Sequence, residues 1–251
     1  MTSRFPGFYK LDAWGRLNTL SEHSPLTNEE KLVLHGNALT VDRADFMIEN
    51  VIGVFGLPLG MAVNFRINGR DCLVPMAVEE TSIVAASSCL ANLIREHGAL
   101  EACAAEALME GQIQLVDVPE PDEARARIEH ARDSLLKIAN EQDRTLVNMG
   151  GGARDIYVRR LDTASGLMLI VHIVVNVMDA MGANAVNTMA EALGPVIAEM
   201  TRGEVLCRII TNLADKALTR ARFELQYDCL KSNGFSGRTV AERIVKAYHF
   251  A

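Results

Sequence analysis

Two runs of alternating apolar and polar residues flank an Asn-Gly dipeptide at residues 68–69. They lie within a stretch, residues 47–88, whose first half is apolar and rich in glycine. Strand-like alternation on both sides of Asn-Gly predicts a β-hairpin closed by a tight turn. A run of small and apolar residues follows, with Thr81 and Ser82 positioned to cap a helix and Gly98 positioned to end it. We therefore expect a hairpin followed directly by a helix.

Strand and helix periodicities alternate between residues 111 and 211. Three consecutive glycines at residues 150–152 end the first helical segment. The expected elements are a strand at 111–118, a helix at 119–144, strands at 153–161 and 167–177, a helix at 179–200 and a strand at 204–211. This β-α-β-β-α-β order is that of the split βαβ, or ferredoxin-like, unit.

The segments on either side of this unit predict a second, larger domain. They contain a Thr-Asn-Glu-Glu capping box at 27–30, an alanine-rich segment at 99–109 that reads as a helix, a strand-like run at 216–225 and a final helix at 237–250. We expect an α+β fold in which a large helical and mixed domain, residues 1–109 and 213–251, is interrupted by the small ferredoxin-like domain, residues 110–212.

Composition indicates a soluble, folded chain. Hydrophobic residues make up 49% and charged residues 23% of the 251 positions, which is typical of globular proteins. The net charge of −7 argues against nonspecific binding to nucleic acid or to anionic membranes, since both need a basic surface. The five cysteines are scattered without metal-site or redox spacing, so we expect reduced, mostly buried thiols in a cytosolic protein. With no leader and no apolar run of membrane-spanning length, we expect a cytoplasmic location.

Two adjacent carboxylates, Glu79 and Glu80, stand between the expected hairpin and its helix. Because their neighbours on both sides are apolar, we expect partial desolvation, which would raise a carboxyl pKa and suit it to proton transfer. The alternative is that both are surface charges stabilised by the positive end of the helix dipole.

A second unusual stretch, residues 179–191, lies where a buried strand ends and a helix begins. Small residues such as Gly182 would let a ligand approach the backbone, and the free N–H groups of the first helical turn favour phosphate. No GxGxxG sequence follows a strand, so a Rossmann site is excluded. The alternative is that Gly182 and Ala183 only permit close packing. Asp143 is a further candidate, because an acidic side chain can bind ribose hydroxyls, although taken alone it is more simply interpreted as a solvated charge.

Three segments together resemble hydroxymethylglutaryl-CoA (HMG-CoA) reductase in its class II, bacterial form. They are Glu49 to Gly53 (ENVIG), Val74 to Ser87 (VPMAVEETSIVAAS) and Asp179 to Glu191 (DAMGANAVNTMAE). The resemblance implies that the small domain binds the dinucleotide and that ENVIG lies at a subunit interface, so that an obligate homodimer, or a multiple of dimers, would form. It also implies interconversion of HMG-CoA and mevalonate by two hydride transfers, with release or uptake of CoA.

The resemblance assigns roles to individual residues. Glu80 matches the family's catalytic glutamate, which delivers a proton to the mevaldyl carbonyl oxygen, and Ser82 matches a position beside the substrate. The dinucleotide-binding loop is matched by residues of the second stretch, namely Asp179, Met181, Gly182 and Asn184. Asp143 falls where NAD-using class II enzymes carry an acidic residue, which favours NAD(H) over NADP(H).

The family also uses a lysine, an aspartate and a histidine that lie downstream of the matched region. Lys246 and His249 are not candidates, because they belong to the final helix, which matches a helix before the catalytic lysine segment. His172 lies within an apolar strand and is interpreted as a core histidine with its hydrogen bonds satisfied. We expect negligible turnover from this polypeptide alone. The alternatives are a catalytically incomplete fragment, a split-enzyme subunit that dimerises, and a nucleotide- or CoA-binding module without catalysis.

Overall fold

The computed structural model describes residues 2–37 and 39–250. The chain divides into two compact units: unit 1, residues 1–102 and 221–251, and unit 2, residues 103–220. From the sequence we expected the domain boundaries at 109/110 and 212/213. The structure instead groups two short segments, 103–109 and 213–220, with unit 2, whereas the sequence assigned them to the large domain. Each unit is described separately below.

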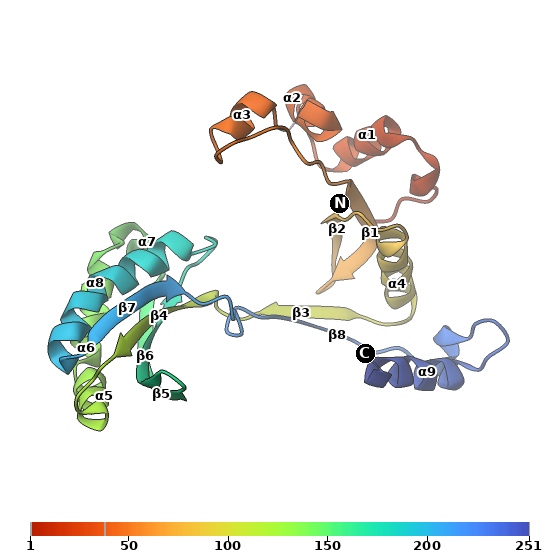
Figure 1. The fold of residues 1–251 in the computed structure, drawn as a ribbon. Coiled ribbons are helices and arrows are strands. Elements are labelled where there is room, and N and C mark those ends of the chain that lie inside the picture. Colours follow the sequence, from red (N-terminus) through yellow and green to blue (C-terminus); the bar gives the residue numbers. More distant parts are fainter. Residues whose placement is uncertain (1, 38, 251) are drawn as a thin grey trace. The chain divides into compact units, whose positions relative to one another are not determined.

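Unit 2 contains a four-stranded antiparallel sheet in the order β5-β6-β4-β7 (Figure 1). Its elements are β4 (Leu108–Val116), α5 (Pro121–His130), α6 (Arg132–Glu141), α7 (Arg144–Asn148), β5 (Gly152–Thr163), β6 (Gly166–Asn176), α8 (Ala183–Thr201) and β7 (Glu204–Ile210). The element order and the pairing of β4 between β6 and β7 confirm the ferredoxin-like unit, and with it the α+β fold class.

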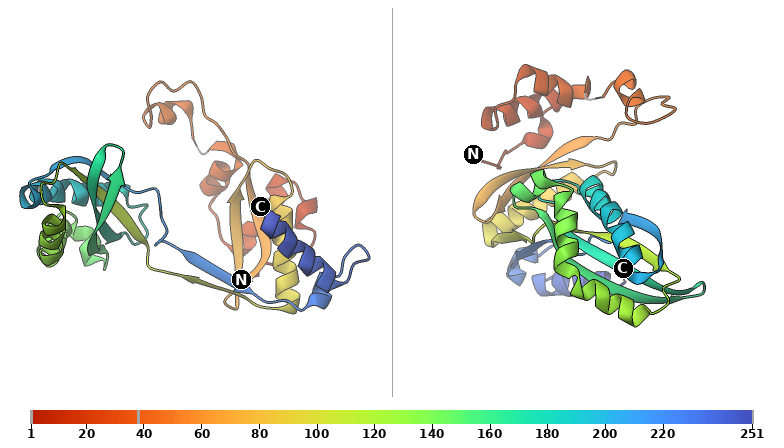
Figure 2. Two further views of the ribbon diagram at one scale, coloured as in Figure 1. Left: turned by 60° about the horizontal axis from the view of Figure 1, so that its bottom comes forward. Right: turned by 90° about the vertical axis from the view of Figure 1, so that its left-hand side faces the viewer.

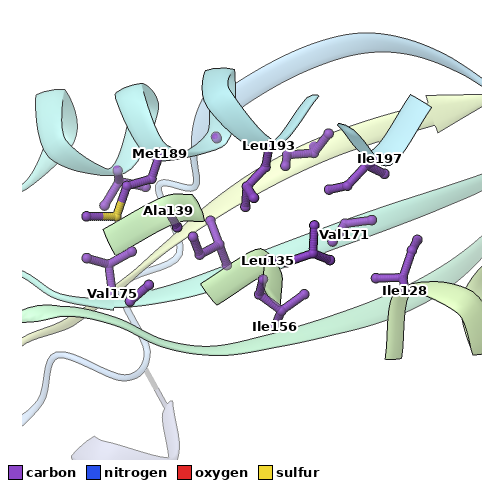
Figure 3. Packing of buried hydrophobic residues seen from close by; sticks show 14 of the residues in the cluster. Ile128, Leu135, Ala139, Ile156, Val171, Val175, Met189, Leu193 and Ile197 are labelled. Carbon is purple, nitrogen blue, oxygen red and sulfur yellow. The ribbon is translucent and has the colours of Figure 1, made fainter. Parts of the chain in front are cut away.

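The core of unit 2 lies between one face of this sheet and helices α5, α6 and α8. Met189, Leu193 and Ile197 of α8 are fully buried and point toward the sheet and α6 (Figure 3). Their spacing of four residues places them on one stripe of the helix. Burial of each large side chain contributes about 1.5–3 kcal/mol, so the continuous core explains why residues 111–211 are the easiest part of the chain to interpret.

The expected helix at 119–144 is wrong as a single element, because the structure divides it into α5, α6 and α7. Ala131, between α5 and α6, leaves the helical region at φ −85° and ψ 5°. Neither glycine nor proline marks this change of direction. The apolar positions also stay in helical phase across it, since Ile128, Leu135 and Ala139 are all buried. Periodicity therefore could not detect the break.

The hairpin and helix of unit 1 form where the alternation predicts them. Strands β1 (Leu59–Ile67) and β2 (Arg70–Ala77) pair antiparallel, and α4 (Ile83–His97) follows. Asn68 and Gly69 both adopt positive φ values, 50° and 77°, as a type I′ turn requires. Gly98 ends α4 at a close approach, where an added Cβ would lie 2.5 Å from the carbonyl oxygen of Glu224.

The expected helix at 99–109 is wrong. This segment instead forms β3 (Leu100–Ala104) and the first residues of β4. The side chain of Asn68 accepts a hydrogen bond from the Ala102 N–H at 2.9 Å and donates one to the Ala102 carbonyl at 2.8 Å. These tertiary bonds hold the alanine-rich segment extended and override its local helix preference.

The first sheet has the order β2-β1-β3-β8, where β8 is Thr219–Phe223, so the strand expected at 216–225 is present but shorter. Figure 2 shows β3 and β8 running side by side. The remaining elements are η1 (Phe8–Lys10), α1 (Ala13–His23), α2 (Asn28–Leu32), η2 (Val33–Asn37), α3 (Val41–Asp45), η3 (Tyr227–Leu230) and α9 (Gly237–Phe250). The capping box is confirmed by reciprocal bonds between Thr27 and Glu30. In the described ranges no helix is long and apolar enough to span a membrane.

The cysteines depart from expectation in their burial. Cys89, Cys103 and Cys207 are exposed, and Cys72 and Cys229 are half-buried. All five are free thiols. They occur in β2, β3 and β7, in α4 and in η3.

Candidate active site

Glu79 and Glu80 lie in a bend between the end of β2 and the start of α4. Both side chains are exposed. The expected partial desolvation of this pair is therefore wrong for the single chain, since the apolar neighbours along the sequence do not fold over the carboxylates. The position between strand and helix is as expected.

Ser82 occupies the N-cap position of α4, but its side chain makes no capping hydrogen bond. Its backbone is left-handed, at φ 72°, whereas a capping serine needs an extended backbone for its Oγ to reach the helix N–H groups. A non-glycine residue in this region is uncommon and costs of order 1 kcal/mol or more. The expected role of Ser82 as a side-chain cap is thus wrong, and its hydroxyl is left available for other partners.

An ion pair joins β2 and α4, the elements on either side of the bend, at their ends away from it. Arg95 donates two hydrogen bonds to the carboxylate of Asp71, each 3.0 Å long, and a third to the Ser3 hydroxyl at 3.1 Å. The Asp71 carboxylate also accepts the Ser3 N–H at 2.9 Å. The guanidinium of Arg95, together with that N–H, lowers the pKa of Asp71 to about 2. The elements on both sides of Glu80 are therefore joined by a bidentate ion pair that is mostly shielded from solvent.

In unit 2, the turn of residues 179–184 leads from β6 into α8. Asp179, Met181 and Asn184 are exposed, whereas Gly182 is buried at the N-cap of α8 with φ 91°. A Cβ at Gly182 would lie 2.5 Å from Cγ1 of Val177, so only glycine fits. No side chain caps α8, and its first N–H groups therefore lack a side-chain acceptor within the described residues.

Asp143 lies at the N-cap of α7, where its carboxylate accepts the Leu146 N–H at 2.8 Å. It is half-buried and so is more constrained than a solvated surface charge. Its second carboxylate oxygen has no protein donor among the hydrogen bonds of the described residues. Asp143 is thus both a structural cap and an acceptor with spare capacity.

The glycines that follow α7, the helix capped by Asp143, lie at the end of β6, from which the 179–184 turn begins. The segment after α7 packs against the end of β6: a Cβ on Gly151 would lie 2.8 Å from the Asn176 carbonyl oxygen. β6 ends at Asn176 and the turn begins a few residues later. Glu80 and Ser82 belong to unit 1, so their relation to the turn stays a prediction.

A cluster that the sequence did not reveal lies on the sheet face opposite the helices of unit 2. This Glu110 cluster consists of Glu110, Tyr157, His172 and Lys216. The buried Glu110 carboxylate accepts the Tyr157 hydroxyl and binds Lys216 Nζ through the same oxygen, both at 2.8 Å. The sequence held one signal for this cluster: Glu110 alternates with the buried residues of its strand, in phase with Gln112 and Gln114, which places all three on the face away from the core.

His172 is buried, as expected, but its hydrogen bonds are not all satisfied. Its Nδ1 has no hydrogen-bond partner and lies 3.9 Å from the nearer Glu110 oxygen. The ring stacks on Tyr157 at a centroid distance of 4.6 Å. Burial lowers the pKa of His172, and the opposing attraction of Glu110 is the smaller effect.

An exposed apolar segment, residues 46–59, connects α3 to β1. Its largest exposed side chains are Phe46 at 94%, Ile52 at 102% and Phe55 at 89%. The others are Met47, Ile48, Val54, Leu57 and Leu59. Exposed apolar segments of this kind are typical of surfaces that contact another molecule.

These features define a class of protein: a mixed α/β chain whose inserted ferredoxin-like unit carries a helix start without a side-chain cap and, on another helix, a half-buried acidic N-cap residue. Comparison with known proteins identifies the family. The sequence profile described as hydroxymethylglutaryl-coenzyme A reductase matches residues 13–251. The chain belongs to the HMG-CoA reductase family.

Two curated relatives give the extent of the similarity. The 3-hydroxy-3-methylglutaryl-coenzyme A reductase of Archaeoglobus fulgidus is 47% identical over the whole chain, which covers 56% of that relative. A probable 3-hydroxy-3-methylglutaryl-coenzyme A reductase of Borreliella burgdorferi is 30% identical over 79% of the chain and 44% of the relative. The chain spans about half the length of the curated relatives it matches.

Solved structures are similar over nearly the whole chain. A class II HMG-CoA reductase from Streptococcus pneumoniae, bound to NADPH in open conformations, has a TM-score of 0.89 and 35% identity, with coverage of 99% of this chain and 67% of its own. Another structure of the Streptococcus pneumoniae enzyme has a TM-score of 0.90 and 34% identity, with coverage of 99% and 59%.

Proposed function

We propose that this chain provides the dinucleotide-binding unit and one catalytic carboxylate of an HMG-CoA reductase, which interconverts HMG-CoA and mevalonate by two hydride transfers. The observation that carries the proposal is the buried, left-handed Gly182 at the uncapped start of α8, in a chain of this family. A glycine with no room for a Cβ lets a ligand approach the helix start closely.

The dinucleotide site would be formed by the 179–184 turn and Asp143. The N–H groups at the start of α8 and the positive end of its dipole would hold the pyrophosphate. Asn184 and Asp179, both exposed, would bind the adjoining polar groups. The bound nicotinamide ring would supply or accept the hydride, and the protein would fix its position and exclude water.

We propose NAD(H) as the preferred dinucleotide. The free oxygen of Asp143 can accept a hydrogen bond from a ribose hydroxyl, whereas its charge would repel a 2′-phosphate. The Leu146 N–H fixes the other oxygen and therefore the orientation of the carboxylate. NADPH is the dinucleotide named for the Streptococcus pneumoniae structure, and a titration with both dinucleotides distinguishes them in this chain.

Glu80 would deliver the proton to the carbonyl oxygen of the mevaldyl intermediate, and Ser82 would lie beside the substrate. In the single chain the Glu80 carboxylate is exposed, so a neighbouring surface must cover it before it can act as a buried acid. We propose that a second copy supplies that cover. The apolar segment 46–59 would form the dimer contact, which would bury side chains such as Phe55.

The test is a titration of the purified chain with NADH and NADPH, followed by nicotinamide fluorescence. We expect saturable binding, tighter for NADH, and loss of most of that preference in Asp143→Ala. Asp143→Asn keeps an acceptor for Leu146 but removes the charge, so it should lose the discrimination against NADPH while still binding NADH. Absence of binding to either dinucleotide would refute the proposal. An unchanged NADH to NADPH ratio in both variants would refute only the role of Asp143.

Turnover is assigned to an assembly that also contains the family's lysine, aspartate and histidine. We therefore expect the chain alone to oxidise NADH with HMG-CoA at a negligible rate. In an assembly that turns over, Glu80→Gln should abolish reduction and leave dinucleotide binding unchanged. Glu79→Gln is the matched control, since it removes the neighbouring charge and should leave the rate within a few-fold.

A further inference from the structure

The Glu110 cluster is not used by the proposed function, and it includes a residue of the segment of unit 2 that returns from β7 to β8. Lys216 belongs to the return segment, residues 211–218, between β7 and β8. We propose that Glu110 and Lys216 form a latch that fastens the return segment to the sheet of unit 2. The proposal does not depend on the identity of any ligand.

The burial of Glu110 makes its carboxylate dependent on Lys216. Only 6% of this residue is exposed, and a buried carboxylate is stable as a charge only with close partners. Its partners are the Tyr157 hydroxyl and the Lys216 ammonium group, both on the same oxygen. Because Lys216 is 38% exposed, the pair joins a buried anchor on the sheet to a cation on a surface segment.

The bonding of the return segment is the second argument. Its root is fixed, since the Ile210 N–H binds the Asn187 side chain of α8 and the Thr211 N–H binds the Glu110 carbonyl, both at 2.8 Å. Between residues 212 and 217, within the described chain, the contact of Lys216 with Glu110 is the only hydrogen bond or ion pair to the rest of unit 2. Without it, residues 212–217 would be held to unit 2 only at their two ends, at Thr211 and at Leu218, whose carbonyl accepts the Ala105 N–H at 2.9 Å.

The charges around the pair are the third argument. His172 of β6 and Tyr157 of β5 lie against Glu110. Arg159 of β5 acts on His172, whose pKa it helps to lower, and Asp215 precedes Lys216. Removal of Lys216 leaves the buried carboxylate with only a phenol and a neutral imidazole in direct reach. Loss of the lysine charge is therefore not compensated locally.

The latch determines how much of the return segment can move independently. When it is closed, Lys216 fastens the middle of the loop between Thr211 and Leu218 to the sheet. When it is open, residues 212–217 form one loop of unit 2 that is held only at Thr211 and Leu218, and such a loop opens more readily.

Amide hydrogen exchange measured by mass spectrometry on the whole chain tests the latch. The informative N–H groups are those of Leu213 and Ala217, which bond within the segment to Thr211 and Ala214. We expect Lys216→Met to speed their exchange about tenfold, the equivalent of one pK unit of lost interaction. Glu110→Gln should have a similar effect on the same peptides, with no change in exchange of β6.

The matched control is Glu191→Gln, which breaks the Arg208–Glu191 ion pair on the other face of the sheet and should leave residues 211–218 unchanged. If Glu110→Gln fails to fold, Lys216→Met decides the question, since it alters a partly exposed side chain. Unchanged exchange at residues 212–218 in Lys216→Met would overturn the latch. A uniform increase throughout unit 2 would also overturn it, because it would indicate general destabilisation.

Discussion

Replacement of Gly182 by alanine should destabilise the fold in two ways, through an unfavourable backbone conformation and through overlap of the new Cβ with Val177. The φ of 91° lies in the left-handed region, which costs an L-residue about 1–2 kcal/mol. The new Cβ would also lie 2.5 Å from Cγ1 of Val177 and 3.0 Å from its Cβ, an overlap that costs about 1–3 kcal/mol when a packed core cannot move. We therefore expect Gly182→Ala to lower the free energy of unfolding by about 2–5 kcal/mol.

Gly150 is the matched control. It has a similar φ of 93°, but a Cβ added there would have no heavy atom within 4 Å. Gly150→Ala should therefore show the conformational cost alone, about 1–2 kcal/mol. Val177→Ala combined with Gly182→Ala should recover part of the overlap cost and none of the conformational cost, because it removes the two Cγ atoms that the new Cβ meets.

Urea unfolding followed by circular dichroism, with dinucleotide binding measured on each folded variant, provides both readouts. We expect Gly182→Ala to weaken dinucleotide binding more than Gly150→Ala does, because only Gly182 starts α8. Equal destabilisation by the two alanines would refute the argument from close packing. Undiminished dinucleotide affinity in Gly182→Ala would refute the proposed site at the start of α8.

Three further predictions follow from other parts of the structure. Burial lowers the pKa of His172 in the folded chain. The contribution of His172 to folding stability is therefore complete above its pKa in the unfolded chain, near 6.5, and is lost as pH falls below that value. The urea midpoint should drop less between about pH 7.5 and 5.5 in His172→Phe than in the unaltered chain. Asp71 has a pKa of about 2 in the folded chain. It therefore contributes stability at pH values above its unfolded pKa, and that stability is lost as pH falls toward 2. Asp71→Asn should lower the free energy of unfolding by about 1–2 kcal/mol at neutral pH and weaken the decrease of the melting temperature with falling pH in the acid range. Phe55→Asp should convert a dimer to a monomer in analytical ultracentrifugation, whereas Leu206→Asp, at another exposed apolar position, should not; a dimer that survives Phe55→Asp would count against segment 46–59 as the contact.

The sequence predicted the parts of the fold in which local and tertiary preferences agree. Around residues 68–69 the turn chemistry and the strand alternation specify the same hairpin, and both turn residues adopt the expected conformations. The ferredoxin-like unit was equally clear, since its buried strand at β6 and the apolar stripe of α8 have unambiguous periods. The three glycines at residues 150–152, the last of which begins β5, also had the expected effect of ending the helical segments.

Prediction failed where a distant residue decides the local structure. The alanine-rich segment at 99–109 is extended because the Asn68 side chain binds both polar groups of Ala102, and no pattern within the segment records that contact. Exposure of Glu79 and Glu80 likewise depends on what folds over the bend, which neighbouring residues do not determine. The Glu110 cluster joins residues from three strands and a connecting segment, so a search for short motifs could not assemble it.

The hydrogen bond from the Ala105 N–H to the Leu218 carbonyl, 2.9 Å long, brings the entry and exit of the inserted unit together. An insertion whose two ends touch replaces a short surface loop in its host, and the host gives up little chain entropy to accommodate it. We therefore expect that residues 105–218 can be deleted as one unit. A brief glycine-containing turn between Ala104 and Thr219 should let the remainder of the first sheet form, and the excised piece should fold around its own core.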